Sequence, residues 1–163
     1  MATRSTISLK ISSEDKGKTF HFDENKLPTV KIGDENVKIT CSNKFIGNIG
    51  DVKIIGDYLT IYHHWDSYPK DGVGETLIQR FNDYDSILNL LCGGDASTIN
   101  RTEIIQYCPW RGESWEFVCP DQSNEEPSVD ENYAYLFKDD KWFFKSRYVK
   151  DWVDLEQYLK TEE

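Results

Sequence analysis

Several features that would quickly assign a sequence to a class are missing from this one. The chain has four cysteines in 163 residues, and no two of them have the C-x-x-C spacing that is typical of a zinc site. It has no apolar run of transmembrane length, no signal peptide and no internal repeat. We therefore expect a cytoplasmic protein with reduced thiols and without a membrane association, a cofactor or a bound metal. The cysteines are Cys41, Cys92, Cys108 and Cys119.

Positive charge is also scarce. Lysine and arginine total 19 residues against 29 aspartates and glutamates, so the net charge is -10. A surface of this sign repels a phosphate backbone, and direct binding of nucleic acid is not expected. The acidity leaves basic protein partners open, including nucleic-acid-binding proteins that an acidic mimic could engage. Solubility alone is the simpler explanation of the same charge.

The stretch from Tyr58 to Leu77 is the one around which the chain is organised. Its first part, up to His64, alternates β-branched and aromatic residues in the manner of a strand. Pro69 cannot donate a hydrogen bond to a sheet, so the strand must end before it. Asp71 or Gly72 can then cap an amphipathic helix. Because successive strand residues point to opposite faces, the core face is expected to hold Leu59, Ile61, His63 and Trp65, and the other face Tyr58, Thr60, Tyr62 and His64.

The remaining elements follow from alternation, helical spacing and turn residues. Expected strands lie at 3–11, 30–32, 37–41, 44–46, 52–55, 103–108, 114–118, 133–137 and 141–146, and expected helices at 73–82, after Asp83 or Asp85, and at 151–160. Gly56-Asp57 predicts a hairpin between 52–55 and the strand from Tyr58, and Asp139-Asp140 predicts another. Residues 120–132 are acidic and polar, which predicts an exposed loop.

Strands with two central helices and a terminal helix, without a βαβ rhythm, predict the α+β class. We expect a single domain over residues 1–163. Its sheet is expected to be twisted and mostly antiparallel, with two central helices and a C-terminal helix. A β-rich insertion is expected at about residues 12–50.

Five short motifs lie along the chain's length. They are the opening Met-Ala-Thr-Arg-Ser-Thr, the signature Tyr62, His64, Trp65, Asp66, Tyr68 and Pro69, the following Gly74 and Leu77, the step Leu91, Gly94, Asp95 and Ser97, and the hairpin Tyr133, Tyr135, Leu136, Phe137, Lys141 and Trp142. In these motifs the chain resembles a family of short, mostly uncharacterised phage-encoded proteins. Ser67 stands where the family usually has glycine. The resemblance implies a phage origin and a fold, but no activity.

The candidate binding residues surround this signature: Tyr62, His64, Trp65, Asp66, Tyr68, Gly72 and Gly74. His64 can act as an acid or base near neutral pH, and Asp66 can orient it. Catalysis also needs a nucleophile or a metal, and Ser67 is too close in the chain to His64 for a convincing dyad. His63 and His64 point to opposite faces, so they cannot easily share a metal ion. A structural role for the whole cluster is the competing interpretation.

The function expected from these observations is binding rather than catalysis. We expect a small acidic phage accessory protein that binds a host protein, such as a defence or nucleic-acid-processing factor, and inhibits it. One alternative is binding, sequestration or hydrolysis of a small nucleotide-like ligand at His64, Asp66 and Tyr68. Gly72-x-Gly74 offers backbone amides to an anion, although Asp71 and Glu75 would repel a phosphate. Another alternative is a structural or virion-associated role.

Overall fold

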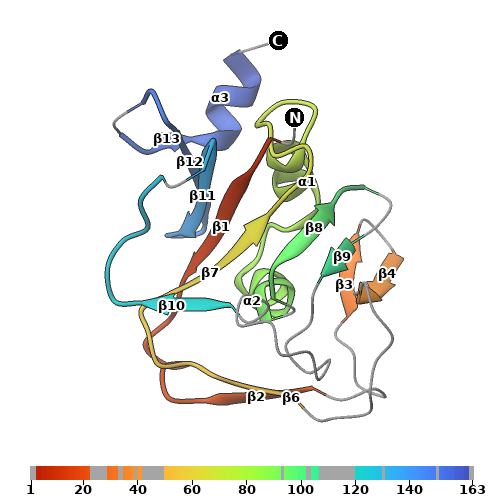
Figure 1. Cartoon of the computed structure of the whole chain (residues 1–163), viewed down its shortest axis with the longest axis vertical. Coiled ribbons are helices and arrows are strands. Elements are labelled where there is room, and N and C mark those ends of the chain that lie inside the picture. The colour runs from red at the N-terminus through yellow and green to blue at the C-terminus, as the bar shows by residue number, and fades with distance from the viewer. Residues whose placement is uncertain are drawn as a thin grey trace.

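The computed structural model describes residues 3–22, 29–32, 35–38, 40–41, 50–92, 94–101, 104–106, 120–129, 131–149 and 151–161. A nine-stranded sheet runs through these residues in the order β13-β12-β11-β1-β7-β8-β9-β5, and β10 also pairs with β7 (Figure 1). Its strands are β1 (Ser5–Lys10), β5 (Thr40–Cys41), β7 (Tyr58–His63), β8 (Ala96–Ile99), β9 (Ile104–Gln106), β10 (Asp121–Ser123), β11 (Tyr133–Lys138), β12 (Lys141–Ser146) and β13 (Val153–Asp154).

The sheet is mixed, with antiparallel pairing between most neighbours. β1 runs parallel to β11, β7 to β8 and β5 to β9, and the other neighbouring strands of this sheet are antiparallel. The apolar residues of β1 are in register with those of both neighbours, so that Ile7 lies opposite Ile61 and Tyr135. All three side chains are buried. Alternation in three separate segments thus places one continuous apolar row on one face of the sheet.

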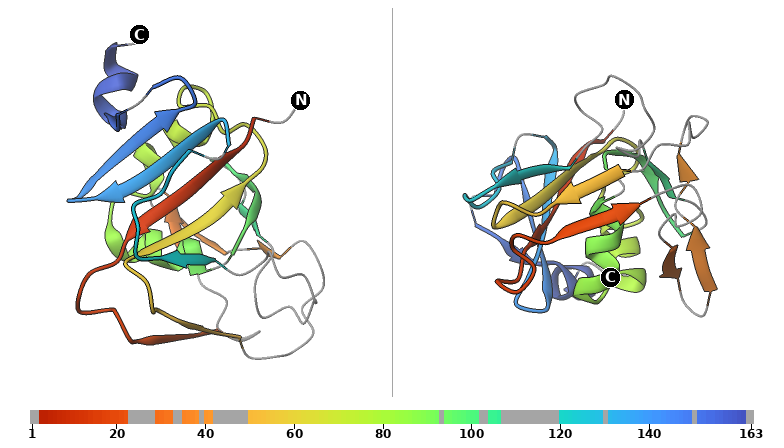
Figure 2. Two further views of the ribbon diagram at one scale, coloured as in Figure 1. Left: turned by 60° about the vertical axis from the view of Figure 1, so that its left-hand side comes forward. Right: turned by 90° about the horizontal axis from the view of Figure 1, so that it is seen from below.

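The helices cover that face (Figure 2). They are α1 (Val73–Arg80), α2 (Tyr84–Cys92) and α3 (Leu155–Thr161). Asp83 caps α2 by accepting a hydrogen bond from the backbone N–H of Ser86 at 2.8 Å, as the sequence predicts. The indole N–H of Trp142 donates to the carbonyl of Phe81 at 2.7 Å, which fixes the end of α1 to β12. Leu77 of α1 is fully buried beneath these contacts.

Two small ribbons lie outside the main sheet. β2 (Thr19–Phe22) pairs with β6 (Gly50–Lys53), and β3 (Thr29–Ile32) pairs with β4 (Glu35–Lys38), both antiparallel. The second pair joins strands that the sequence predicts at 30–32 and 37–41, although the second of these begins at Glu35. β2, β3 and β4 lie within the segment that the sequence suggests as an insertion, and β6 follows at its end. The predicted strands at 44–46 and 114–118 lie outside the described residues.

The predicted hairpin over Gly56-Asp57 is wrong. β6 pairs with β2, while β7 is occupied by β1 on one edge and by β10 and β8 on the other. The side chain of Gln122 explains this, because its Oε1 accepts the N–H groups of Ile55 and Gly56 and its Nε2 donates to Lys53. A side chain reaching from β10 therefore takes the hydrogen bonds that a hairpin would have made.

The α+β class and the arrangement of two central helices with a C-terminal helix are confirmed. Several boundaries differ from the prediction: α1 ends at Arg80, the last helix begins at Leu155 instead of 151, and β6 covers 50–53 instead of 52–55. The exposed loop expected at 120–132 contains β10. The short β13 replaces the first turn expected for the last helix. Within the described part of the chain, no helix is long and apolar enough to cross a membrane.

Candidate functional site

The candidate site lies at the end of the sheet where β1 begins and β7 ends. Ser5 is paired with His63 in the antiparallel register of these strands. The chain then turns, and Ser67 returns to the same place, where its backbone N–H donates to the carbonyl of Thr3 at 3.1 Å. The hydroxyl of Ser67 lies 2.6 Å from Nδ1 of His63 and accepts a hydrogen bond from Ser5 at 2.8 Å. These three side chains form a fully buried polar cluster.

The hydrogen bonds assign the tautomer of His63. Its Nε2 lies 3.1 Å from the backbone N–H of Ile99 and must accept from it, so the proton of the neutral ring is on Nδ1 and points to Ser67. Burial, with a smaller contribution from the neighbouring His64, lowers the pKa of His63 to about 3. The cluster resembles a histidine–serine dyad in composition, but it is sealed from solvent. Its effect is to tie β7, the loop after it and β8 together.

The loop from Trp65 to Gly72 has a tightly defined backbone. Asp66 and Asp71 both adopt left-handed conformations, with φ values of 56° and 59°. The carbonyl of Asp66 accepts the N–H of Val73 at 2.8 Å, which closes the loop onto the start of α1. A Cβ at Gly72 would lie 2.5 Å from that same carbonyl, so only glycine fits there. The close approach of the Asp66 and Tyr68 backbone to Gly72 holds the loop in one shape.

A pocket of about 340 Å³ opens between this loop and the end of β8, and we call it the Trp65 pocket. Its walls include Trp65, Asp66, Asp71, Glu75, Ile99 and Arg101. Glu75 forms an ion pair with Arg101 at 3.5 Å and accepts the backbone N–H of Asp71 at 3.1 Å. Among the described residues, the carboxylates of Asp66 and Asp71 have no hydrogen-bond or ion-pair partner. The pocket is therefore acidic, with an aromatic wall.

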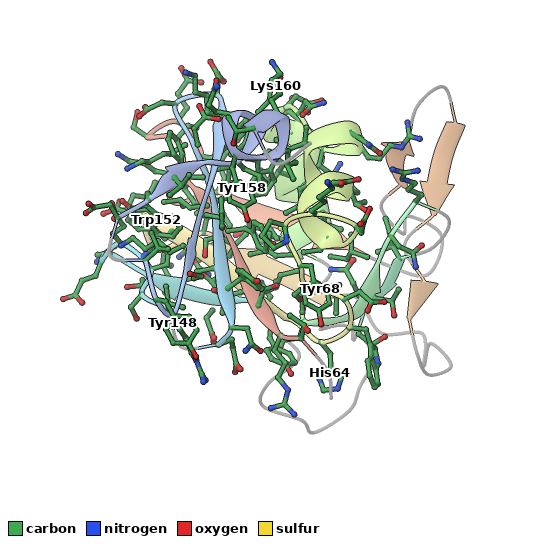
Figure 3. The ribbon with its side chains drawn as sticks, turned by 90° about the horizontal axis from the view of Figure 1, so that it is seen from above. His64, Tyr68, Tyr148, Trp152, Tyr158 and Lys160 are labelled. Carbon is green, nitrogen blue, oxygen red and sulfur yellow. The ribbon has the colours of Figure 1, made fainter. Side chains whose placement is uncertain are left out.

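Aromatic residues, three of them exposed and two half-buried, gather beside the Trp65 pocket. We define the aromatic end as His64, Trp65, Tyr68, Tyr133 and Tyr148. His64 packs edge-on against Trp65 with ring centroids 4.7 Å apart, and its Nδ1 lies 2.6 Å from the hydroxyl of Tyr62. Tyr68, Tyr133 and Tyr148 line a second hollow of about 350 Å³ with Arg147. Figure 3 shows His64, Tyr68 and Tyr148 along one side of the molecule.

Asp95 binds the backbone of β7 next to the site. Its Oδ1 accepts the backbone N–H of Tyr62 at 2.9 Å, at the point on the edge of β7 between the partners β10 and β8. Burial raises the pKa of Asp95 to about 7, and the negative charge of Asp121 contributes in the same direction, while the Tyr62 hydrogen bond opposes the shift. The Asp95 carboxylate thus accepts a backbone N–H at the edge of β7, between the segments of that edge that pair with β10 and β8.

The structure distributes the sequence-predicted residues over four places. Tyr62, His64 and Trp65 are in contact, and Trp65, Asp66 and Gly72 line the Trp65 pocket. Tyr68 lines the second hollow instead, so the expected single patch of His64, Asp66 and Tyr68 is divided. Gly74 packs against the backbone of Pro69, where a Cβ would lie 2.5 Å from the Pro69 carbonyl oxygen.

Two expectations about individual residues are wrong. Trp65 is not on the core face but half-exposed, because β7 ends at His63 and the alternation of faces stops with it. The sequence suggests that Asp66 orients His64, but no hydrogen bond joins their side chains in the described part of the chain. The backbone carbonyl of Asp66 holds the turn instead, and its carboxylate projects from a left-handed residue at the pocket wall. The burial of His63 agrees with the prediction.

The sequence reasoning missed the buried cluster and the role of Asp95. His63 is predicted on the core face, and a polar residue on a core face needs hydrogen-bond partners. That requirement is the signal that could have found Ser5 and Ser67.

Cys92 is buried without a disulfide, and burial raises the pKa of its thiol to about 12, so it is unreactive. Within the described ranges, no group of three or more histidine, cysteine, aspartate or glutamate side chains could hold a metal ion.

Comparison with protein-family models, with curated proteins and with solved structures found no match for this chain. The fold and the site therefore have to be interpreted from their own residues.

Proposed function

We propose that this is a small acidic phage accessory protein that acts in the cytoplasm of the infected cell by binding a host protein through the aromatic end. One observation carries the proposal. Of the large hydrophobic residues that are exposed in the described part of the chain, Trp65 (51%), Tyr68 (46%), Tyr148 (93%) and Val149 lie at or beside this end, and Ile55 (64%) lies elsewhere. Exposed apolar residues that gather in one place are typical of an interaction surface.

The chemistry of these residues suits a protein interface. Tryptophan, tyrosine and arginine are the residues that most often dominate binding energy, and the second hollow combines Tyr68 and Tyr148 with Arg147. The side chains are also partly fixed before binding, since the ring of His64 holds that of Trp65. A pre-ordered aromatic side chain loses little conformational freedom when a partner covers it. The phage origin rests on the sequence resemblance alone.

Catalysis is less well supported. His63 and Ser67 have the residue types of a catalytic pair, but both are fully buried, and a substrate could not reach them without unfolding of the loop. His64 is accessible, yet its Nδ1 is engaged by the hydroxyl of Tyr62. A nucleotide-like ligand is also disfavoured in the Trp65 pocket, because its phosphates would meet the carboxylates of Asp66, Asp71 and Glu75.

The test is capture of a host protein from lysate by the immobilised protein and by single variants. Trp65→Ala, Tyr68→Ala and Tyr148→Ala are compared with Ile55→Ala, which removes an equally exposed hydrophobic side chain outside the aromatic end. We expect one partner to be retained by the wild type and by Ile55→Ala. Replacement of an aromatic residue at a binding hot spot costs about 2 kcal/mol or more of binding free energy. The affinity of the captured partner for each purified aromatic variant should therefore fall roughly thirtyfold.

Each variant is first shown to unfold at the wild-type temperature. A partner that binds all four variants equally well, or that is lost equally with Ile55→Ala, would show that the aromatic end is not the contact surface.

A further inference from the structure

We propose that the Trp65 pocket receives an arginine side chain of the partner protein. This inference rests on the proposed function, because it specifies the chemistry of the partner that meets the adjoining aromatic end. The pocket volume of about 340 Å³ exceeds what a single side chain needs, so a guanidinium and part of its alkyl chain can enter.

The charges in the pocket favour a cation. Asp66, Asp71 and Glu75 contribute three negative charges, and Arg101 contributes one positive charge. Arg101 is already paired with Glu75, at 3.5 Å. This leaves the carboxylates of Asp66 and Asp71, which have no partner within the described residues. An entering guanidinium would meet a net negative pocket on a protein whose total charge is -10.

The aromatic wall favours arginine in particular. The ring of Trp65 is half-exposed at the pocket, and the edge-on contact with His64 at 4.7 Å keeps it from turning freely. A guanidinium is planar and weakly hydrated, so it can stack on an indole and still donate hydrogen bonds to carboxylates in its own plane. An ammonium group can satisfy the charge but not the stacking. Trp152 shows the weaker form of such a contact elsewhere, with Lys145 4.7 Å from its ring centroid.

The backbone holds the two free carboxylates in place. Asp66 and Asp71 stand at the two ends of a loop that is closed by the hydrogen bond from Val73 to Asp66 and by the close contacts of Gly72. A loop fixed in this way needs little ordering when the cation binds, which improves affinity. The pocket thus combines charge, an aromatic wall and a rigid rim.

The first experiment uses a small probe in place of the partner. Protein with ¹⁵N-labelled tryptophan is titrated with acetyl-arginine-amide, and the indole N–H signal of Trp65, assigned by its disappearance in Trp65→Phe, is followed. Acetyl-citrulline-amide has nearly the same shape without the charge and serves as the control. We expect a saturable shift with arginine at a dissociation constant on the order of 1–10 mM, reduced by added salt. Equal shifts with citrulline, or no saturable shift, would overturn the inference.

Variants then locate the site. Asparagine tolerates the left-handed conformation as aspartate does, so Asp66→Asn and Asp71→Asn remove charge without straining the loop. Asp139→Asn is the matched control, because Asp139 also has a positive φ, 52°, but lies in the turn between β11 and β12 at the far end of those strands. We expect each pocket variant to weaken the arginine probe at least threefold and Asp139→Asn to leave it unchanged. Unchanged binding in both pocket variants would refute the site.

The two proposals fail in different ways. If Tyr148→Ala abolishes partner capture while Asp66→Asn and Asp71→Asn retain it, the aromatic end binds a protein but the Trp65 pocket receives no cation. If the probe binds as expected and Trp65→Ala weakens capture while Tyr68→Ala and Tyr148→Ala do not, the cation site stands and the rest of the aromatic end is not the interface. A lysine derivative that binds as tightly as the arginine probe would contradict the assignment to a guanidinium.

Discussion

His63 is the last residue of β7, and Asp95 binds the backbone of the residue before it. Burial favours the uncharged form of both side chains, so it lowers the pKa of His63 and raises the pKa of Asp95. Their effects on the pH dependence of stability are opposite. His63 has a folded pKa of about 3 against 6.5, so the unfolded chain binds more protons between these values and stability falls as the pH drops through this window. Asp95 has a folded pKa of about 7 against 3.8, so stability falls as the pH rises from about 4 to 7.

Asp95→Asn should separate the two contributions. Asparagine can still accept the N–H of Tyr62 but cannot ionise, so the loss of stability between pH 4 and 7 disappears. Relative to the wild type, we expect the variant to gain roughly 1–3 kcal/mol between pH 4 and pH 8, after allowance for the partial exposure of Asp95. Urea unfolding at a series of pH values measures this difference. A constant difference across the range would mean that Asp95 has an ordinary pKa.

Ser67→Ala tests the buried cluster. The substitution leaves the Nδ1–H of His63 and the hydroxyl of Ser5 without their partner, in a place that water does not reach. We expect a loss of about 1–3 kcal/mol in the free energy of unfolding. Ser8→Ala is the control, because its partner Thr60, at 2.7 Å, is only half-buried and can turn to water. Chemical denaturation that shows equal, small losses for both variants would contradict this account.

At the scale of helices and strands, local signals predict well where neighbours in the chain are also neighbours in the fold. The hairpin of β11 and β12 forms over Asp139-Asp140, both with positive φ, as that dipeptide suggests. α2 begins at its predicted cap. The Gly56-Asp57 hairpin fails because Gln122, more than sixty residues away in the chain, takes the backbone groups that the turn would use. Such a contact leaves no local trace in the sequence.

Leu77→Ala tests the predicted phase of α1. Leu77 is fully buried where α1 packs on the sheet, so its removal loses apolar contact and leaves a cavity. We expect a cost of about 2–5 kcal/mol, or a decrease in melting temperature of roughly 4–20 °C for a domain of this size. Gln79→Ala, at an exposed position of the same helix, should change the melting temperature little. Calorimetry of both variants gives the comparison, and an unchanged midpoint for Leu77→Ala would place the residue outside the core.

For the whole molecule, the class of the fold could be predicted and the surface could not. Alternation reports which side chains are buried, and Leu59, Ile61 and His63, which it places on the core face, are all buried. The same patterns do not say which exposed residues meet. Tyr68 and Tyr148 line one hollow because β1 brings the end of β7 beside β11 and β12. The order of strands in the sheet therefore assembles the aromatic end. The central stretch of the sequence supplies His64, Trp65 and Tyr68, and the segment around β11 and β12 supplies the rest.

The position of β1 in the sheet also sets an order of events during synthesis. β1 is made before the other strands, but β11, one of its two neighbours in the sheet, follows 128 residues later in the chain. At about 5–20 residues per second, a ribosome needs roughly 6–25 s to make that length of chain. Until Tyr58–His63 is made, neither edge of the nascent strand has its partner, and from then until Tyr133–Lys138 is made only the β7 edge can be paired. A chaperone that shields Ile7 and Leu9 in the growing chain would therefore act before β11 exists.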